Sequence, residues 1–360
     1  MNRKTRTSWP MLFSLSILAA AILPSLALGQ DKGGPEDLTI RQEIAPATQR
    51  AKLVPGLIGK KETAFSSLEQ ITFEGSAAAP RFGPRSGRVI FQGTLPGEAH
   101  DQIYTVNRDG TERYRASTGS GRAAGPVFLP DGQSFVYAST HLREETPERP
   151  KGGGAHPRDF DEAYDLFVSD FRGSILRRLT ETPGYDAECS LSPSGKLILW
   201  TSGRDGDLEI YRMHISGGAL MRVTNSKGYE GGAVFSPDES RIAYHASRTG
   251  DGKDLQIYLS GSAGEDPVRL TKNDAVNYAP SFHPDGDRIV FTSNMDDPDN
   301  FELYMMKIDG TEVTRITHSP GYDGFPSFSP DGRLLLFSSG RADPKSGDTL
   351  VFAADFKPYW

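Results

Sequence analysis

The chain has 360 residues, with 40 Lys and Arg against 47 Asp and Glu and a formal net charge of −7. An acidic chain lacks the basic surface on which binding to nucleic acids and anionic membranes depends, so we expect neither as a partner. The single cysteine, Cys189, excludes an intramolecular disulfide, and the fold must therefore be held together by packing.

The first 29 residues have the pattern of a secretory signal peptide. Basic residues within 3–6 precede the apolar stretch Met11–Leu23, and small residues at Ala27 and Gly29 mark a cleavage site. The stretch is too short to span a bilayer comfortably. We predict cleavage after Gly29 and a periplasmic or secreted mature chain without a membrane span; an uncleaved membrane anchor is the alternative.

Residues 30–66 mix charged residues with Gly and Pro without strong periodicity, which predicts a linker with at most one short helix. From residue 67 a unit recurs whose most regular part is an apolar strand ending in a Pro-Asp-Gly turn. Three regular and three degenerate copies have their prolines at Pro84, Pro130, Pro193, Pro237, Pro284 and Pro330. These prolines lie 46, 63, 44, 47 and 46 residues apart, a period typical of a four-stranded propeller blade.

Each turn is followed by an apolar run, such as Val89–Phe91 or Leu334–Phe337. Such runs indicate strands covered on both faces, as a blade between two neighbours requires. The sixth unit stops at Trp360 before a fourth strand, while a spare strand-like segment, Leu68–Thr72, precedes the first unit. We therefore predict an all-β fold over residues 67–360: a six-bladed β-propeller of four-stranded antiparallel blades, closed by an N-terminal strand in the last blade.

The repeat also resembles a known family. The Phe-Ser-Pro-Asp-Gly turn at 328–332, the segments SGRDGDLEIY at 202–211 and SNMDDPDNFELY at 293–304, and the Arg-Leu-Thr strands are similar to those of the TolB-like family of Pro-Asp β-propeller repeats. The resemblance covers residues 68–360. It implies the propeller fold, and together with the predicted export it favours a binding or scaffolding role in the cell envelope.

Propeller topology predicts where a binding site lies. Strands alternate in direction, so the connections after the second and fourth strands of each blade emerge on one face and the Pro-Asp-Gly turns on the other. Aromatic and charged residues recur in the first set of connections, where they suit recognition of a peptide at the channel mouth. The predicted ligand-binding residues are Tyr185, Asp186, Glu188, Arg204, Tyr229, Glu230, Arg248, Tyr278, Tyr322, Asp323 and Arg341.

These residues have an alternative interpretation as turn residues that bond their own backbone. We expect Arg204, Arg248 and Arg341, which follow second strands, to neutralise the acids of the mouth, so that the ligand is neutral or cationic. An insertion over 142–163 emerges on the same face and is either functional or disordered.

No catalytic signature accompanies this site. The chain has no Gly-x-Ser-x-Gly elbow, no His-Glu-x-x-His and no cysteine pair for zinc, so we predict no catalytic residue, cofactor or metal. The favoured function is a monomeric, non-catalytic binding or scaffolding module whose partner is an envelope protein or peptide segment. One alternative is a metal-assisted carbohydrate lyase or hydrolase, for which His141 and His245 lie toward the right face but in non-adjacent blades. Another pairs the propeller with a separately encoded peptidase.

Overall fold

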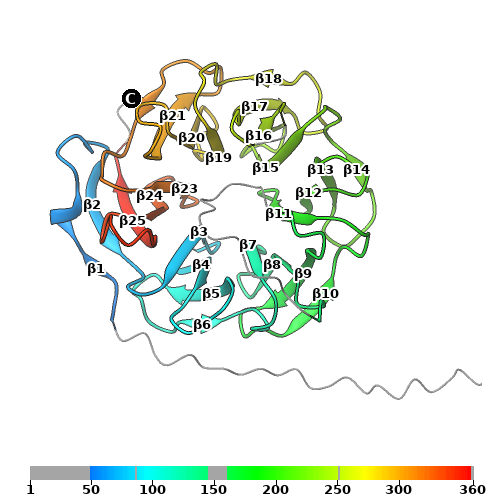
Figure 1. The fold of residues 1–360 in the computed structure, drawn as a ribbon, viewed down its shortest axis with the longest axis horizontal. Coiled ribbons are helices and arrows are strands. Elements are labelled where there is room, and N and C mark those ends of the chain that lie inside the picture. Colours follow the sequence, from blue (N-terminus) through cyan, green and yellow to red (C-terminus); the bar gives the residue numbers. More distant parts are fainter. Residues whose placement is uncertain (1–48, 86, 145–159, 250–251, 358–360) are drawn as a thin grey trace, which may run out of the picture. The chain divides into compact units, whose positions relative to one another are not determined.

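The computed structural model describes residues 49–85, 87–144, 160–249 and 252–357, which form six antiparallel sheets arranged in a ring (Figure 1). Five sheets have four strands and one has five. In each blade the first strand after the repeat boundary lies nearest the centre, and the others pair outward in order. The prediction of an all-β, six-bladed propeller with four-stranded antiparallel blades is confirmed.

The first three blades follow the repeat read from the sequence. The first contains β3 (Ser76–Phe82), β4 (Arg88–Thr94), β5 (Gln102–Asn107) and β6 (Tyr114–Arg115). The second contains β7 (Ala123–Phe128), β8 (Ser134–Ser139), β9 (Asp165–Asp170) and β10 (Ile175–Arg178). The third contains β11 (Asp186–Leu191), β12 (Leu197–Ser202), β13 (Glu209–His214) and β14 (Met221–Arg222).

The next two blades repeat the same order. The fourth contains β15 (Tyr229–Phe235), β16 (Arg241–Ser247), β17 (Gln256–Gly261) and β18 (Val268–Arg269). The fifth contains β19 (Asn277–Phe282), β20 (Arg288–Ser293), β21 (Glu302–Lys307) and β22 (Thr314–Arg315).

The last blade is completed by the N-terminal part of the chain. It contains β23 (Asp323–Phe328), β24 (Leu334–Ser339) and β25 (Leu350–Phe356), then β2 (Phe65–Gln70) and, outermost, β1 (Lys52–Leu53). Strand β2 pairs antiparallel with β25, with Leu68 opposite Ala354. Leu68 is fully buried in a core cluster with Phe337 and Phe352. The strand therefore closes the ring as predicted, both by pairing an edge and by burying apolar surface.

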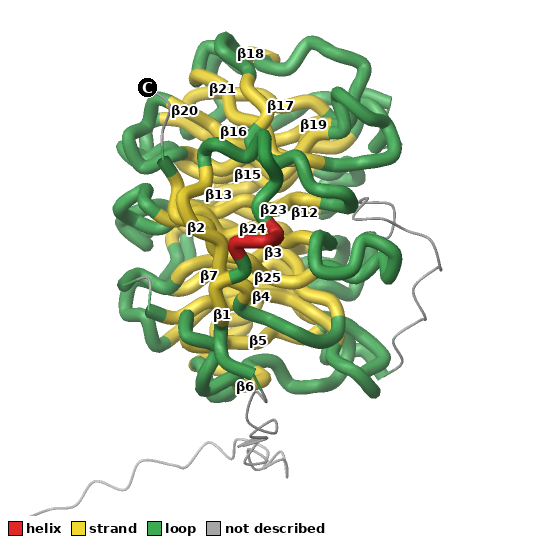
Figure 2. Tube along the Cα trace, turned by 90° about the vertical axis from the view of Figure 1, so that its left-hand side faces the viewer, coloured by secondary structure: helices red, strands yellow, loops and turns green. Residues whose placement is uncertain are grey.

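The segment expected to be a linker, 30–66, is described from residue 49. That part holds β1 and a 3-10 helix, Pro55–Leu57, next to β2 (Figure 2). Val54 and Ile58 pack against the core of the last blade, so residues 49–66 are part of the propeller and do not act as a linker. The predicted signal peptide over 1–29 and the stretch 30–48 lie outside the described residues. None of the helical segments in the described part of the chain has the length and apolar character that crossing a membrane requires.

The Pro-Asp-Gly turns show why the blades repeat. In the second blade, Oδ1 of Asp131 accepts hydrogen bonds from the backbone N–H groups of Gln133 and Ser134, both at 2.8 Å, and Gly132 has a φ of 65°. Asp bonds its own backbone two residues on, and Gly tolerates a positive φ, so the chain reverses locally between two strands. The turns of all six blades surround one end of the central channel, which opens there into a cavity of about 550 Å³.

Candidate functional site

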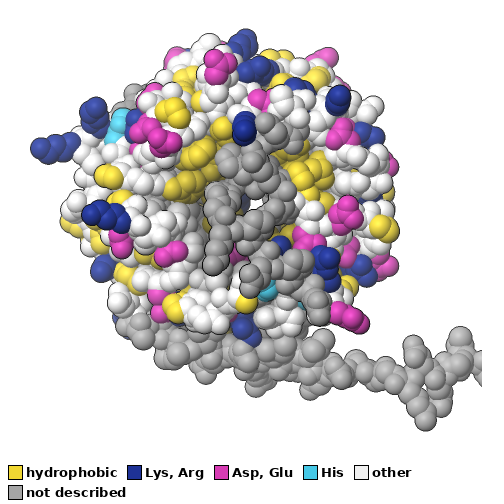
Figure 3. Space-filling model, in the orientation of Figure 1, with side chains coloured by type: hydrophobic (Ala, Val, Ile, Leu, Met, Phe, Trp, Pro, Cys, Tyr) yellow, Lys and Arg dark blue, Asp and Glu magenta, His cyan; other side chains and the backbone are white. Residues whose placement is uncertain are grey.

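A second cavity, of about 230 Å³, lies in the channel toward the starts of the inner strands. Aromatic side chains form much of its wall, and Figure 3 shows hydrophobic side chains gathered around the centre of the face turned to the viewer. The aromatic lining residues are Phe160, Tyr164, Tyr185, Tyr229, Tyr278 and Phe325. Four of the residues predicted from the sequence line this cavity: Tyr185, Glu188, Tyr229 and Tyr278.

Every inner strand contains a β-bulge at the same position of the repeat, seen as a register shift against the second strand. The residue at the bulge has a φ between 50° and 59°. These residues are Ala79, Gly125, Glu188, Gly232, Ala279 and Phe325. A bulge re-aims the side chains beside it and is frequent next to functional sites. In the third blade it directs Glu188 into the channel wall, at the strain that a non-glycine residue carries in the left-handed region.

Glu188 is the centre of a polar network in this wall. Its carboxylate accepts hydrogen bonds from the Tyr229 hydroxyl at 2.8 and 2.9 Å and from the Tyr185 hydroxyl at 3.3 Å. The Thr201 hydroxyl and the backbone N–H of Gly232 each donate at 2.9 Å. Four donors match the roughly four lone-pair sites of a carboxylate. The group is therefore fixed in place and has no free lone pair with which to act as a general base.

Tyr229 links this carboxylate to His245. The Tyr229 hydroxyl lies 2.9 Å from Nε2 of His245. Because the hydroxyl proton is donated to Glu188, Nε2 must donate its own proton to the Tyr229 oxygen, and Nδ1 carries the lone pair. Nδ1 has no hydrogen-bond partner among the described residues. Burial lowers the pKa of His245, in agreement with a neutral ring. Burial and the Glu188 carboxylate raise the pKa of Tyr229 well above its usual value, so both rings are uncharged near neutral pH.

A second aromatic group extends the wall into the fifth and sixth blades. The hydroxyls of Tyr278 and Tyr322 are hydrogen-bonded at 2.8 Å. The rings of Phe301 and Phe325 pack edge-on against Tyr278, with centroid distances of 5.5 and 5.7 Å. Tyr322 therefore supports the wall from behind Tyr278, since it belongs to the same core cluster but is not among the residues that line the cavity.

The end of the insertion 142–163 reaches the same wall. Phe160 packs on Tyr185 and Tyr229 with centroid distances of 5.1 and 5.3 Å. Asp161, the next residue, forms ion pairs with Arg122 at 3.7 Å and Arg143 at 2.8 Å. Residues 145–159 lie outside the described residues, so the two alternatives for the insertion stay open there, while its described end is part of the site.

The remaining predicted acids and arginines lie in the seams between blades and do not line the cavity. Asp186, Glu230 and Asp323 are fully buried. Alternation along a strand turns these side chains away from the channel, whereas the neighbouring Tyr185 and Ala187 face it. The ion pairs join Arg204 to Asp186 at 3.1 Å, Arg248 to Glu230, and Arg341 to Asp323 at 3.0 Å.

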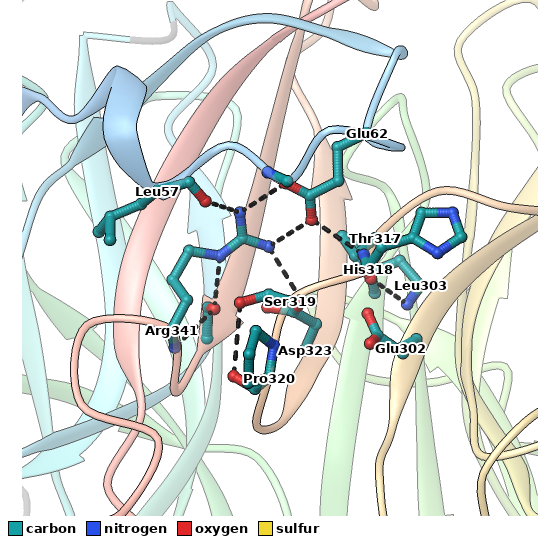
Figure 4. A network of polar contacts seen from close by, with 12 residues as sticks. Leu57, Glu62, Glu302, Leu303, Thr317, His318, Ser319, Pro320, Asp323 and Arg341 are labelled. Carbon is teal, nitrogen blue, oxygen red and sulfur yellow. Dashed lines mark hydrogen bonds and ion pairs between the residues drawn. The ribbon is translucent and has the colours of Figure 1, made fainter.

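The seam of Arg341 is closed by the N-terminal segment (Figure 4). Arg341 lies between Asp323 and Glu62, its Nη2 being 3.1 Å from Oε1 of Glu62, and both acids are fully buried. Glu62 also accepts hydrogen bonds from the backbone N–H groups of Gly59 at 2.6 Å and His318 at 3.0 Å. The N-terminal segment therefore contributes a counter-charge to the last blade as well as a strand.

Two seams contain a pair of carboxyl groups. Glu230 meets Glu209 from the preceding blade, and Arg222 binds Glu209 at 2.6 Å. Burial, followed by the charge of Glu209, raises the pKa of Glu230 to about 8. The same arrangement recurs two seams further on with Asp323, Glu302 and Arg315. In each pair, burial and the neighbouring carboxyl raise the pKa of the acid on the inner strand, Glu230 or Asp323, because two buried carboxylates in contact repel each other.

Sequence reasoning missed the part of the wall that the first blade supplies. Arg81 and Gln92 line the cavity, but the search followed Tyr and acid segments that the first blade lacks. Aligning the six repeats at their turn prolines shows the signal that was missed. Arg81 stands three residues before Pro84, where the third blade has Ser190 before Pro193, so a cationic side chain replaces a small one at a channel position of the repeat.

The histidines considered for a metal site lie apart. His141 packs on Phe167 with a centroid distance of 4.4 Å and hydrogen-bonds through Nδ1 to Ser139 at 2.9 Å. His245 lines the cavity, where it bonds Tyr229. Across residues 49–357, gaps excepted, no group of three or more His, Cys, Asp and Glu side chains is arranged to hold a metal ion.

Comparison with known proteins places this geometry in a family. The sequence model of the TolB beta propeller domain matches residues 158–257 and 253–357. A protein assigned as TolB from Agrobacterium tumefaciens is 21% identical with a TM-score of 0.53, and the match covers 79% of this chain and 91% of that one. TolB from Acinetobacter baumannii is 22% identical with a TM-score of 0.56, over 76% of this chain and 64% of that one.

The fold is also shared with an enzyme. An oligogalacturonate lyase solved in complex with manganese is 13% identical with a TM-score of 0.52, and the match covers 85% of this chain and 96% of that one. Such identities establish a common propeller fold, which hosts unrelated functions.

Proposed function

Since the chain belongs to the TolB beta-propeller family, we propose that it is an exported, non-catalytic binding module of the cell envelope that captures a polypeptide segment at its channel mouth. The observation that carries this proposal is the cavity wall, in which aromatic rings surround a carboxylate that is already fully hydrogen-bonded. Tyr and Phe provide large contact area at a small cost in side-chain entropy, and Tyr adds one polar tip.

The size of the cavity supports a segment as ligand. A volume of about 230 Å³ accommodates a side chain or a chain end and is too small for a folded partner. Export follows from the signal-peptide pattern over 1–29, and an envelope setting is drawn by analogy from the TolB proteins of similar fold.

The test compares two adjacent residues with opposite environments. Tagged wild-type protein, Tyr185→Ala and Asp186→Asn are used to capture partners from an envelope extract. Truncating a ring that lines the cavity should reduce partner retention at least about tenfold, since an aromatic anchor contributes about 2 kcal/mol or more. Asp186→Asn should lower the melting temperature and retain the partner, because Asp186 is buried with Arg204 and Trp200.

Retention of the partner by Tyr185→Ala would show that the channel mouth is not the binding site. The metal-assisted lyase hypothesis is tested separately with polygalacturonate and added manganese. We expect no turnover, and turnover that disappears in His245→Ala would overturn the non-catalytic assignment.

A further inference from the structure

Arg81 is a cation of the channel wall that has no counter-ion among the described residues. It lies on β3 and lines the cavity. Its Nη1 donates a hydrogen bond to the backbone oxygen of Pro80 at 3.2 Å, and no Asp or Glu of the described residues forms an ion pair with it or enters the electrostatics of the group. The seam arginines differ, because Arg204 and Arg341 each bind a buried carboxylate.

An anion would stabilise this position. Arg81 is half-buried, and withdrawing part of a guanidinium from water without pairing it is unfavourable. Burial lowers the pKa of Arg81 to about 10, which still leaves the group positively charged at neutral pH. Nothing in the fold requires a cation here, since the corresponding residue of the third blade is Ser190. The charge is therefore best explained by a ligand.

A neutral donor accompanies Arg81. Gln92 on β4 also lines the cavity, and its Oε1 accepts the backbone N–H of Gly125 at 2.8 Å. That bond fixes the orientation of the amide, so the NH₂ end remains available as a donor. Both residues belong to the first blade, on strands that pair with each other.

The charges of the cavity wall indicate which class of anion would bind. Glu188 is saturated with donors, and Arg122 is engaged by Asp161. One positive charge with no counter-ion among the described residues suits a monoanion better than a phosphate dianion. A guanidinium fork matches a carboxylate in two parallel hydrogen bonds.

We propose that a carboxylate of the ligand enters the channel and pairs with Arg81, with the amide of Gln92 as second donor and the aromatic wall around the adjoining residue. This inference deepens the proposed function, and it replaces the neutral or cationic ligand expected from the sequence. The carboxylate is either the C-terminus of a peptide or an acidic side chain.

The experiment measures the affinity of four probes by NMR titration of the full mature protein. Acetyl-Gly-Phe carries a terminal carboxylate, acetyl-Gly-Phe-amide is its uncharged match, acetyl-Glu-Phe-amide carries a side-chain carboxylate, and inorganic phosphate tests for a general anion site. At least one carboxylate probe should bind about tenfold more tightly than the uncharged amide, because a charge-assisted pair contributes that much. Whichever carboxylate probe binds identifies the source.

The variants assign the effect to Arg81. In Arg81→Gln the tenfold preference should disappear, and in Arg81→Lys, which keeps the charge but lacks the fork, it should be partly retained. Lys307→Gln, which removes an exposed lysine paired with Glu312, should bind the probes as the wild type does. Because Arg81 has no ion-pair partner among the residues that the structure describes, Arg81→Gln should melt no lower than the wild type, so a loss of binding will not reflect unfolding.

Equal binding of acid and amide probes, an unchanged preference in Arg81→Gln, or tighter binding of phosphate would each overturn the inference. The outcome is separable from that of the proposed function. If the carboxylate preference is absent while Tyr185→Ala loses the partner, the binding function stands without the anion site. If the preference depends on Arg81 but Tyr185→Ala keeps its partner, the anion site stands and peptide capture at the mouth fails.

Discussion

The channel side and the seam side of the inner strands carry similar residues with different roles. Tyr185 faces the cavity, whereas Asp186, the next residue, is fully buried against Trp200 and Arg204. On the seam side Asp186, Glu230 and Asp323 each pair with an arginine, and on the channel side Arg81 has no acid among the described residues. Polar residues of the seams therefore stabilise the ring, while those of the channel are positioned for a ligand.

The largest expected loss of stability follows from opening the ring at its closing strand. Deleting Ser67–Phe73 removes four of the six residues of β2, with the buried Leu68, from the last blade. The free energy of unfolding should fall by more than about 4 kcal/mol, since truncating one large buried residue costs about 2–5 kcal/mol. Urea unfolding measures it, with Ser66→Ala as the control at an exposed position. An unchanged midpoint would show that another segment closes the ring.

Breaking one buried seam should come next in size. Arg341→Met leaves Glu62 and Asp323 facing each other without a cation and should cost about 3–5 kcal/mol. The control is Lys307→Met, whose exposed pair with Glu312 should contribute about 1 kcal/mol or less. Equal losses in the two variants, again by urea unfolding, would mean that seam and surface pairs do not differ.

Substitutions at the β-bulges of the inner strands test the channel side. Gly232 has a φ of 57°, and a Cβ there would lie 2.2 Å from Cε1 of His245. Gly232→Ala should therefore disturb the bonds of Glu188 and cost about 1–3 kcal/mol. At the corresponding bulge, Ala279 has a φ of 50°, and Ala279→Gly should be neutral or stabilising. If Gly232→Ala is as stable as the wild type, the channel wall adapts more freely than this network implies.

The smallest expected effect is a pH dependence of the seams. The pKa of Glu230 is raised in the folded chain to about 8, above its unfolded value, so the folded chain holds a proton that the unfolded chain has released. The stability from this group is complete at low pH and is lost as the pH rises toward 8. Wild-type melting temperature should fall between about pH 6.5 and 8.5, above the range in which the buried His245 titrates.

Glu230→Gln keeps the shape of the protonated acid and cannot ionise, so its melting temperature should fall less over the same interval. Glu312→Gln, at an exposed position, is the control and should follow the wild type. A slope in Glu230→Gln equal to that of the wild type would show that the protonation of Glu230 does not contribute to stability.

Much of the fold was predictable because its signals are local. Pro130, Asp131 and Gly132 determine a turn through φ preferences and a bond to the neighbouring backbone, wherever the turn lies in the ring. The closing strand was predictable from a count of strands, since an unpaired edge in the last blade requires one. The packing of residues 49–66 was not, because Val54 and Glu62 find their partners only in the assembled last blade.

The candidate site was predictable in part. The repeat placed Tyr185, Glu188, Tyr229 and Tyr278 at one end of the channel, and all four line the cavity. The acids beside them could not be separated from this group by residue type. Whether the side chains of these acids point to the channel or to a seam depends on the register of the inner strands.

The sequence by itself determined six blades, the closing strand and the end of the channel toward which the aromatic residues lie, since these follow from spacing and turn chemistry. Only the tertiary structure decided which charges are neutralised. A bulge in each inner strand sets the direction of side chains, and ion pairs such as that of Glu62 with Arg341 join residues 279 positions apart. The same holds for Arg81, because only the cavity that the six inner strands form together shows that no acid of the described residues pairs with it.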